Sequence, residues 1–359
     1  MAFSFVSILL GSSLILQASA SPLATSSRCC NLLDTEFKGA QKVVYPQTSE
    51  FGVLNTYFAP TSQQTPSCIF TPSNATDISR AIKLFTRRSC KFAVRSGGHH
   101  YNAGWASIND GILLSLSNLN DVIYDPISSP DSVFVGSGNR WRKVYETVEP
   151  HGFTVVGGQN ADVGVGGFLV NGGISYVADQ YGWAVDNVRE FEIVVADGSI
   201  LRANKKDNKD LFRALKGGSS NFGVVTGFTL DTIKSSVITT TFVGYPETSY
   251  DAFINAAYEY CWKGEDPKSQ ILFISFLNFK NGTFSLQTAA SIIYADALQI
   301  SSPPKVWAPF VNGSIPFLGT QVKAQGGTLG SHGRELAGVQ RSGGVLPDRR
   351  FRSSQMLSF

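Results

Sequence analysis

The stretch Lys91-Phe-Ala-Val-Arg-Ser-Gly-Gly-His-His-Tyr-Asn-Ala-Gly-Trp105 combines a short apolar segment, a pair of glycines and two histidines. We predict a buried strand at 92–94, because the segment is apolar and short. Gly97 and Gly98 tolerate backbone conformations that other residues avoid, so the chain can turn sharply there. Consecutive N–H groups in such a turn form a concave anion site, and Arg95 beside it adds a charge suited to a phosphate.

His99 stands at the mouth of this predicted anion site. A neutral imidazole is a competent nucleophile, so a histidine beside a bound cofactor can bond to it covalently. Taken alone, the stretch fits equally well with an ordinary loop in which His99 and His100 are polar residues with satisfied hydrogen bonds, because short glycine motifs recur by chance.

Two further glycine-rich segments follow along the chain. The first contains Gly157, Gly158, Gly164, Val165, Gly166, Gly167, Gly172 and Gly173, and the second contains Gly223, Val224 and Val225. A dinucleotide-binding Rossmann fingerprint is disfavoured in the first, because Leu169 stands where its third glycine belongs. We interpret these glycines as points where the backbone approaches a flat ligand; the alternative is that they serve only turns and tight packing.

The three motifs, in this order and spacing, resemble those of the FAD-linked oxidases with a p-cresol-methylhydroxylase-type (PCMH-type) FAD-binding domain. This group contains vanillyl-alcohol oxidase, berberine-bridge-like enzymes and fungal oligosaccharide oxidases, and the resemblance covers roughly Pro66 to Ile233. It implies an α+β fold, with a PCMH-type domain of mixed short strands and helices at 63–234 and a partial antiparallel-sheet substrate domain at 235–324. Family members continue well beyond this point, so we expect a truncated C-terminus.

The resemblance also implies roles for single residues. FAD would lie with its pyrophosphate on Arg95, Ser96, Gly97 and Gly98, and its flavin would be bonded through the 8α-methyl carbon to His99, with His100 as the less favoured neighbour. The segment from Gly157 to Gly173 would line the isoalloxazine and ribityl portion, and the backbone at 223–225 would contact the adenine end. Doubly linked members have a cysteine where this chain has Asn160, so we expect a single link.

The first residues of the chain are typical of secretion. An apolar stretch at 3–16 precedes Ala18-Ser19-Ala20, which predicts a signal peptide at 1–20, although the absence of Lys and Arg before it leaves an uncleaved anchor as the alternative. We assign 21–62 to an N-terminal segment. The three sequons at Asn74, Asn281 and Asn312 agree with secretion and predict glycosylation.

Five cysteines follow the predicted cleavage site, which favours an oxidising compartment. Cys29 and Cys30 are adjacent and should bond to different partners, with Cys68 and Cys90 as candidates whose pairing the sequence does not decide. Cys261 is left over, either as a buried free thiol or with a partner outside this chain. We expect no metal site, because the chain lacks a paired Cys-x-x-Cys set and histidines at ligand spacing.

The composition bounds the remaining possibilities. Of 359 residues, 43% are hydrophobic and 16% are charged, which indicates a packed globular protein with room for two domains. The net charge of +3 without a long basic run gives no support for a nucleic-acid partner. The tail at 325–359 is rich in Gly, Arg and Ser, and we expect it to be disordered or atypical.

The resemblance, together with the features of secretion, implies a secreted FAD-dependent oxidase that removes a hydride from a small natural product, in secondary metabolism, and passes the electrons to dioxygen. Its partners would be this small-molecule substrate and dioxygen, with no membrane after signal cleavage. The alternatives are a mono- or oligosaccharide oxidase, and a truncated flavin-binding protein without catalysis. Tyr101 and His151 are candidates for a catalytic base, which the sequence does not identify.

Overall fold

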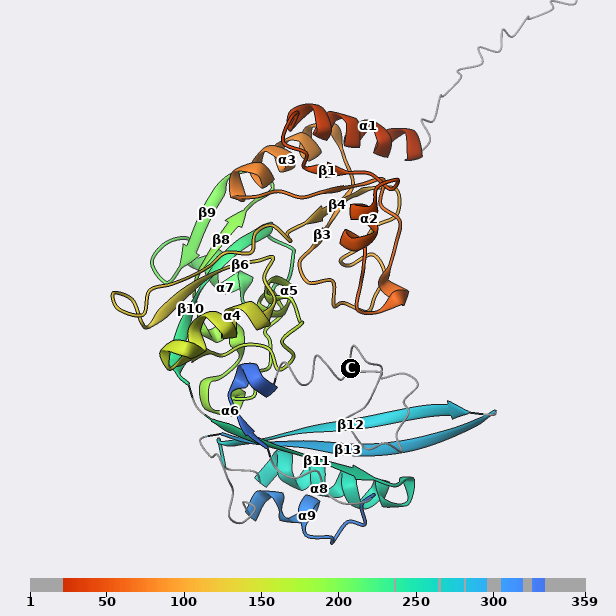
Figure 1. Ribbon diagram of the computed structural model, residues 1–359, viewed down its shortest axis with the longest axis vertical. Coiled ribbons are helices and arrows are strands. Elements are labelled where there is room, and N and C mark those ends of the chain that lie inside the picture. Colours follow the sequence, from red (N-terminus) through yellow and green to blue (C-terminus); the bar gives the residue numbers. More distant parts are fainter. Residues whose placement is uncertain are drawn as a thin grey trace, which may run out of the picture.

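The computed structural model describes residues 22–235, 237–263, 266–280, 282–295, 305–318 and 325–332. The predicted signal peptide, the sequon at Asn281 and the tail beyond His332 lie outside these residues. Three sheets follow one another along the longest axis of the molecule (Figure 1). The mixture of helices and sheets confirms the predicted α+β class.

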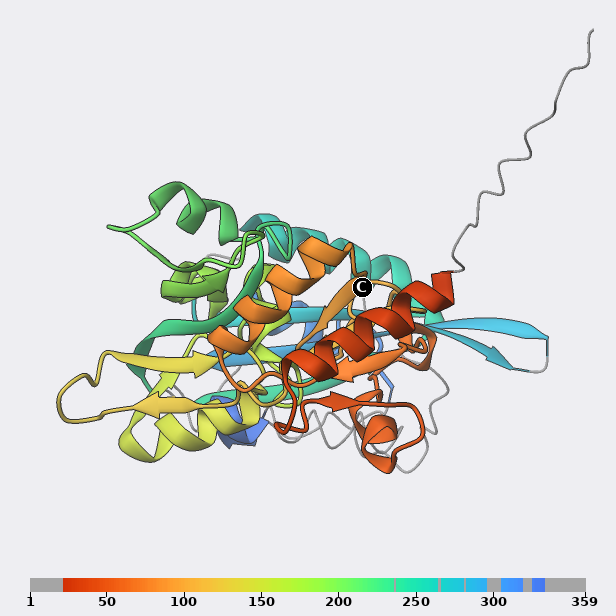
Figure 2. The same cartoon turned by 90° about the horizontal axis from the view of Figure 1, so that it is seen from above.

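The first sheet has the order β1-β2-β4-β3 and carries the strand of the opening motif. Its strands are β1 (Val43–Val44), β2 (Cys68–Phe70), β3 (Phe92–Arg95) and β4 (Ile112–Ser115), with β2 and β3 parallel to β4. Its helices are α1 (Pro22–Glu36), α2 (Ser49–Leu54) and α3 (Ala75–Arg88), and α1 and α3 lie side by side in Figure 2.

Two disulfides fasten α1 to this sheet. Cys29 bonds to Cys90 and Cys30 bonds to Cys68, which confirms that the adjacent cysteines have different partners. Cys261 is a free thiol and is exposed, so the expectation of a buried thiol is wrong.

The second sheet forms the middle of the molecule around the strand β10 (Val224–Lys234). Its order is β5-β6-β10-β8-β9, and β7 pairs with the far end of β10. These strands are β5 (Val122–Tyr124), β6 (Ser132–Gly136), β7 (Phe153–Val155), β8 (Val188–Val194) and β9 (Ile200–Asn204). The associated helices are α4 (Trp141–Val148), α5 (Val165–Val170), α6 (Ala178–Tyr181) and α7 (Lys209–Leu215). Trp141, Tyr145 and Phe228 are fully buried in this core.

The third sheet is antiparallel, as expected for the partial substrate domain, with the order β12-β13-β11-β14. It consists of β11 (Ile238–Tyr245), β12 (Ser269–Lys280), β13 (Thr283–Ala295) and β14 (Gln325–Gly327). The helices α8 (Tyr250–Lys263) and α9 (Ala308–Val311) cover one face through Phe253 and Phe310. The far ends of β12 and β13 extend away from the body of the molecule in both views (Figures 1 and 2).

Residues 325–332 differ from the expected disordered or atypical tail. β14 pairs with β11, and Leu329 is fully buried in the core of the second sheet. Glu149 accepts hydrogen bonds from the Thr328 hydroxyl at 2.8 Å and from the Gly330 N–H at 2.7 Å. Backbone pairing and one buried leucine therefore fix a glycine-rich segment that lacks an apolar pattern of its own.

None of the helices in the described ranges is long and apolar enough to cross a membrane.

The boundaries of the predicted domains remain predictions.

Candidate functional site

The glycine turn after β3 touches the segment that begins α5. A Cβ atom at Gly97 would lie 2.5 Å from the Gly164 Cα, and a Cβ atom at Gly164 would lie 2.4 Å from the Gly97 nitrogen. These distances leave no space for a side chain at either position. The first and second sequence motifs, which are far apart along the chain, are thus in backbone contact.

Ser96 and the loop before α4 hold this contact together. The Ser96 hydroxyl donates to the Ser137 carbonyl at 2.7 Å, and a Cβ atom at Gly166 would lie 2.8 Å from the same carbonyl oxygen. Arg140 donates to the Gly97 carbonyl at 3.0 Å and also to the Asp162 carbonyl. Ser137 and Arg140 could not be identified from the sequence, because no motif in the chain marks residues that bridge two loops.

Arg95 lies beneath the turn instead of at its mouth. Its guanidinium donates to the Leu54 carbonyl at 2.8 Å and to the Thr56 carbonyl, and it lies 5.0 Å from the centre of the Tyr57 ring. The side chain is only 6% exposed. The carbonyl groups at the end of α2 thus engage the charge that we expected to face a phosphate, and in this structure Arg95 braces the turn.

His99 is held between two aromatic rings. Phe58 stacks on the imidazole with ring centres 3.9 Å apart and an interplanar angle of 12°, while Tyr101 meets it edge-on. The Nε2 atom of His99 is buried and has no hydrogen-bond partner among the described residues. Burial, and then the positive charge of Arg140, lowers the pKa of His99. The imidazole is therefore neutral at neutral pH and has a nitrogen available to a ligand.

His100 and His151 have different surroundings. The His100 ring stacks on Trp105 at 4.7 Å, and its Nδ1 accepts a hydrogen bond from the Asn102 N–H at 3.0 Å. His151 is exposed and contacts the Tyr124 ring of β5, so the structure does not bring it to the glycine segments. Of the two candidate bases, only Tyr101 lies beside His99.

Gly157 and Gly158 pack against α4. A Cβ atom at either position would lie 2.5 Å from the Trp141 ring, and the Tyr145 hydroxyl donates to the Gly158 carbonyl at 2.9 Å. These contacts favour tight packing as the reason for both glycines, which is the alternative that the sequence left open.

The remaining predicted glycines have varied surroundings. Gly172 and Gly173 have φ angles of +102° and +80° and approach the rings of Trp183 and Phe168, respectively. Gly167 is exposed, and a Cβ atom there would meet nothing within 4 Å. The side chain of Val165, beside Gly164 and Gly166, is fully buried.

The start of β10 offers only backbone to a ligand. Gly223 has a φ angle of +145°, and a Cβ atom there would lie 2.3 Å from the Val194 carbonyl oxygen. The side chains of Val224 and Val225 are buried at 4% and 8% exposure. Any contact of 223–225 with a cofactor would therefore come from backbone groups.

Several buried polar atoms near these segments lack a hydrogen-bond partner among the described residues. They include the Arg95 Nε, His99 Nε2, Ser137 Oγ, Asn139 Oδ1, Trp141 Nε1 and Ser175 Oγ atoms. Each such atom costs about 1–3 kcal/mol unless a ligand or water satisfies it. A cofactor rich in phosphate, hydroxyl and ring heteroatoms would supply partners, so this set fits a dinucleotide such as FAD.

The third sheet connects to this region through Gln270 of β12. The Gln159 side chain donates to the Gln270 Oε1 at 2.9 Å, and the Gln270 Nε2 donates to the Ser175 carbonyl at 3.0 Å. The face of the sheet that carries Gln270 therefore lies toward the glycine segments.

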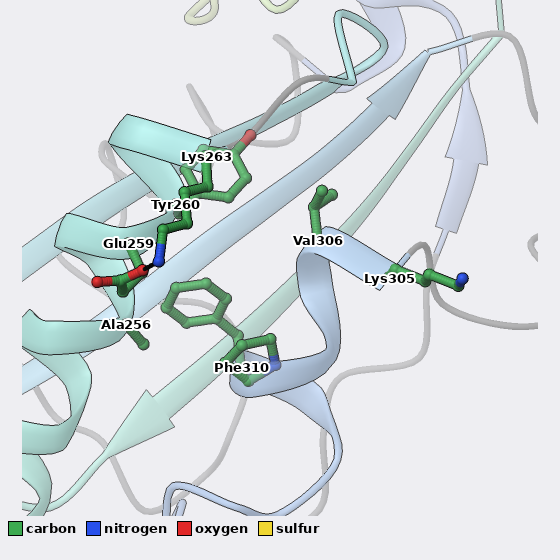
Figure 3. Close-up of a pocket in the computed structure, with 8 residues that line it drawn as sticks. Ala256, Glu259, Tyr260, Lys263, Lys305, Val306 and Phe310 are labelled. Carbon is green, nitrogen blue, oxygen red and sulfur yellow. Dashed lines mark ion pairs between the residues drawn. The ribbon is translucent and has the colours of Figure 1, made fainter.

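A separate pocket lies on the other side of the third sheet, between α8 and α9 (Figure 3). It encloses about 150 Å³ and is lined by Ala256, Glu259, Tyr260, Lys263, Lys305, Val306, Pro309 and Phe310. None of these lining residues belongs to a predicted glycine motif, so we do not assign the cofactor to this pocket.

Comparison with known proteins identifies a family that matches part of the chain. Residues 66–204 match the family described as FAD binding domain. The chain is 33% identical over 282 residues to the FAD-dependent monooxygenase drtC of Aspergillus calidoustus, covering 77% of this chain and 53% of that protein. It is 35% identical over 246 residues to the bifunctional solanapyrone synthase of Alternaria solani, covering 68% and 47%. The chain thus spans about half the length of these curated relatives.

Among solved structures, the fold is similar to a xylooligosaccharide oxidase from Myceliophthora thermophila C1 in complex with xylobiose. The TM-score is 0.70 at 23% identity, and the match covers 85% of this chain and 63% of the oxidase. At this identity the likeness concerns the fold alone.

Proposed function

The chain belongs to the FAD-linked oxidoreductases with a PCMH-type FAD-binding domain, and from this premise we propose that it is a secreted oxidase of small natural products. It would remove a hydride from a carbon that bears oxygen or nitrogen and use dioxygen as the acceptor. The observation that carries this proposal is the buried Nε2 atom of His99, which has no partner in the described part of the chain and lies beside the Gly97–Gly164 contact.

The backbone of Ser96, Gly97 and Gly98 would hold the pyrophosphate, with Arg95 bracing the turn from below. His99 would form the single covalent link to the flavin. FAD, when bound, supplies the redox chemistry by accepting a hydride and returning electrons to dioxygen. The amide of Asn160 accepts a hydrogen bond from the Asp162 N–H at 2.8 Å, and it offers no thiol for a second link.

The neutral state of His99 supports its role as the linking residue. Burial and the charge of Arg140 disfavour the imidazolium form, which has no lone pair for bond formation. Phe58 covers one face of the imidazole, and Tyr101 meets the ring edge-on.

The face of the third sheet that carries Gln270 favours a largely apolar substrate. Side chains alternate along β12, so Leu272, Ile274 and Phe276 share a face with Gln270. Their partners across the pair with β13 include Ser291 and Ala289, which are also uncharged. This face suits a small, mainly apolar natural product.

Secretion is part of the proposal. The two disulfides agree with an oxidising compartment, and the sequon residues Asn74 and Asn312 are exposed. Protein from a eukaryotic secretory host should lose mass on enzymatic deglycosylation; an unchanged mass would argue against glycosylation at these positions.

The experiment is an anaerobic reduction assay followed by exposure to air. We expect aromatic or aliphatic natural-product alcohols to bleach the flavin absorbance, and air to restore it with release of hydrogen peroxide. Turnover of oligosaccharides alone would favour the sugar-oxidase alternative. Incorporation of oxygen into the product without free peroxide would indicate a monooxygenase, the activity for which drtC is named. A bound flavin that no donor reduces would overturn catalysis altogether.

A further inference from the structure

Residues 54–58, which precede the matched FAD-binding domain, contact the glycine turn. The carbonyls of Leu54 and Thr56 accept hydrogen bonds from Arg95, and the Tyr57 ring lies over the guanidinium group. The Phe58 N–H then donates to the Gly98 carbonyl at 3.0 Å. The family match begins at residue 66, so these contacts come from outside it.

The backbone bond between Phe58 and Gly98 determines where the Phe58 ring lies. The ring is 38% exposed and stacks on His99 with centres 3.9 Å apart, tilted by only 12°. Tyr101 meets the Phe58 ring edge-on at 5.7 Å, so the three rings form one packed group. In this arrangement the imidazole plane is nearly parallel to the plane of the Phe58 ring.

We propose that Phe58 is a positioning residue that sets the orientation of the His99 imidazole for bonding to the flavin. This inference rests on the proposed role of His99 as the linking residue. A ring held by stacking on one face keeps its nitrogens in a fixed plane, so less freedom is lost when the new bond forms. Without the Phe58 ring, the imidazole can rotate about its side-chain bonds, and the link should form more slowly.

The linking reaction balances with dioxygen as the oxidant. A C–N bond forms between the imidazole and the flavin 8α carbon, while one hydrogen leaves the methyl group and one leaves the imidazole. Dioxygen accepts both hydrogens and their electrons as hydrogen peroxide. Phe58 takes no part in these bond changes.

The chain offers a matched control in the neighbouring histidine. Trp105 stacks on His100 with a tilt of 7°, in the same kind of pair as Phe58 and His99. Replacing Trp105 by leucine removes a stacking ring without touching His99. The test therefore compares Phe58→Leu with Trp105→Leu, and uses Phe58→Tyr as the conservative variant that keeps the ring.

The measurement is the rate at which flavin becomes resistant to acid extraction after FAD is added to FAD-free protein. Stacking of aromatic rings corresponds to about two- to tenfold in such a rate. We expect this slowing for Phe58→Leu, and wild-type rates for Phe58→Tyr and Trp105→Leu. The affinity for FAD before the bond forms, measured at early times, should be similar in all variants that fold. Should Phe58→Leu fail to fold, Phe58→Met replaces it.

The outcomes separate this inference from the proposed link. Wild-type rates in both leucine variants would overturn the positioning role while leaving the link in place. Slowing by Trp105→Leu alone would move the link to His100 and overturn the inference. Flavin that acid extracts completely from the wild-type protein would overturn the covalent link, and the inference with it.

Discussion

At the residue scale, His99 and His100 carry the same side chain in different environments. The Nε2 atom of His99 is buried without a partner among the described residues, whereas His100 accepts a backbone hydrogen bond beside an exposed Trp105. The sequence could single out this pair, because glycines precede it directly. It could not distinguish the roles of the two residues by itself, because the difference comes from Phe58 and Arg140, which lie far along the chain.

The pKa of His99 predicts how formation of the flavin link depends on pH. Burial and the charge of Arg140 lower this pKa below the ordinary value of 6.5, so the neutral imidazole persists in mildly acidic solution. The rate of linking should therefore decrease in acid with a midpoint below pH 6.5. A pH series of acid-resistant flavin formation measures this rate, and a midpoint above 6.5 would contradict the account.

The lowered pKa of His99 also makes the folding stability depend on pH. Because the pKa of His99 is lower in the folded state, the unfolded chain takes up the proton first as the pH decreases. The stability that this residue contributes is present above pH 6.5 and is lost as the pH falls toward its folded pKa.

The direction of the Arg95 side chain could not be predicted from the residues around it. An arginine beside a glycine turn is a reasonable phosphate ligand by charge, but the guanidinium is directed to the carbonyls of Leu54 and Thr56. The sequence does not reveal this, because the competing acceptors belong to the end of a helix some forty residues earlier.

At the element scale, the contact between the turn after β3 and the start of α5 is the tightest feature of the site. Gly164→Ala should lower the free energy of unfolding of the FAD-free protein by about 1–3 kcal/mol, because the new methyl group meets the Gly97 backbone and neither segment can move freely. Urea unfolding measures this change.

Gly167→Ala is the matched control for this substitution. Gly167 lies on α5, three residues after Gly164, is exposed, and has open space where the new methyl group would lie. Its substitution should leave stability unchanged or raise it by up to about 1 kcal/mol, since alanine favours helix. Equal losses for both variants would mean that the Gly97–Gly164 contact is not specifically tight.

Residues 325–332 lend themselves to a second test at this scale. Leu329 is fully buried among residues of the second sheet, so Leu329→Ala should cost about 2–5 kcal/mol of unfolding free energy. Ile127→Ala, at a position that is 90% exposed, should change it by less than about 0.5 kcal/mol. Thermal or urea unfolding distinguishes the two, and a negligible effect of Leu329→Ala would show that the segment is only loosely attached.

Helices with a periodic apolar face could be predicted from the sequence, and helices without such a face could not. The spacing of Ile78, Ala81, Ile82 and Phe85 is that of one helix face and is sufficient to predict α3, which Asn74 caps. The helix α1 has a weak apolar pattern and was not foreseen. Two disulfides and its packing on α3 hold it instead, and these constraints are not local in sequence.

At the scale of the whole molecule, the disulfides connect the N-terminal helix to the first sheet. The double variant Cys30→Ser, Cys68→Ser should lose about 2–5 kcal/mol of unfolding free energy, because the unfolded chain regains the freedom of a 38-residue loop. Cys261→Ser is the control, since this thiol is free and exposed. Similar stability of both variants in urea would contradict a structural role for the Cys30–Cys68 bond.

The overall arrangement followed from the sequence to a large extent. Three ordered motifs predicted a PCMH-type domain and an antiparallel substrate sheet after it, and both features are consistent with the three sheets along the molecule. The meeting of Gly97 with Gly164, and of Gln270 with Gln159, depended on tertiary packing that no local pattern encodes.

The central claim is that His99 holds FAD covalently, and peptide mass mapping tests it most directly. Protein from a secretory host would be digested with a protease, and peptides would be separated by their flavin absorbance at visible wavelengths. We predict that one peptide carries the mass of the flavin cofactor and that fragmentation places it on His99, with no second attachment. A flavin on His100 or any other residue, or peptides of unmodified mass from protein that contains FAD, would contradict it.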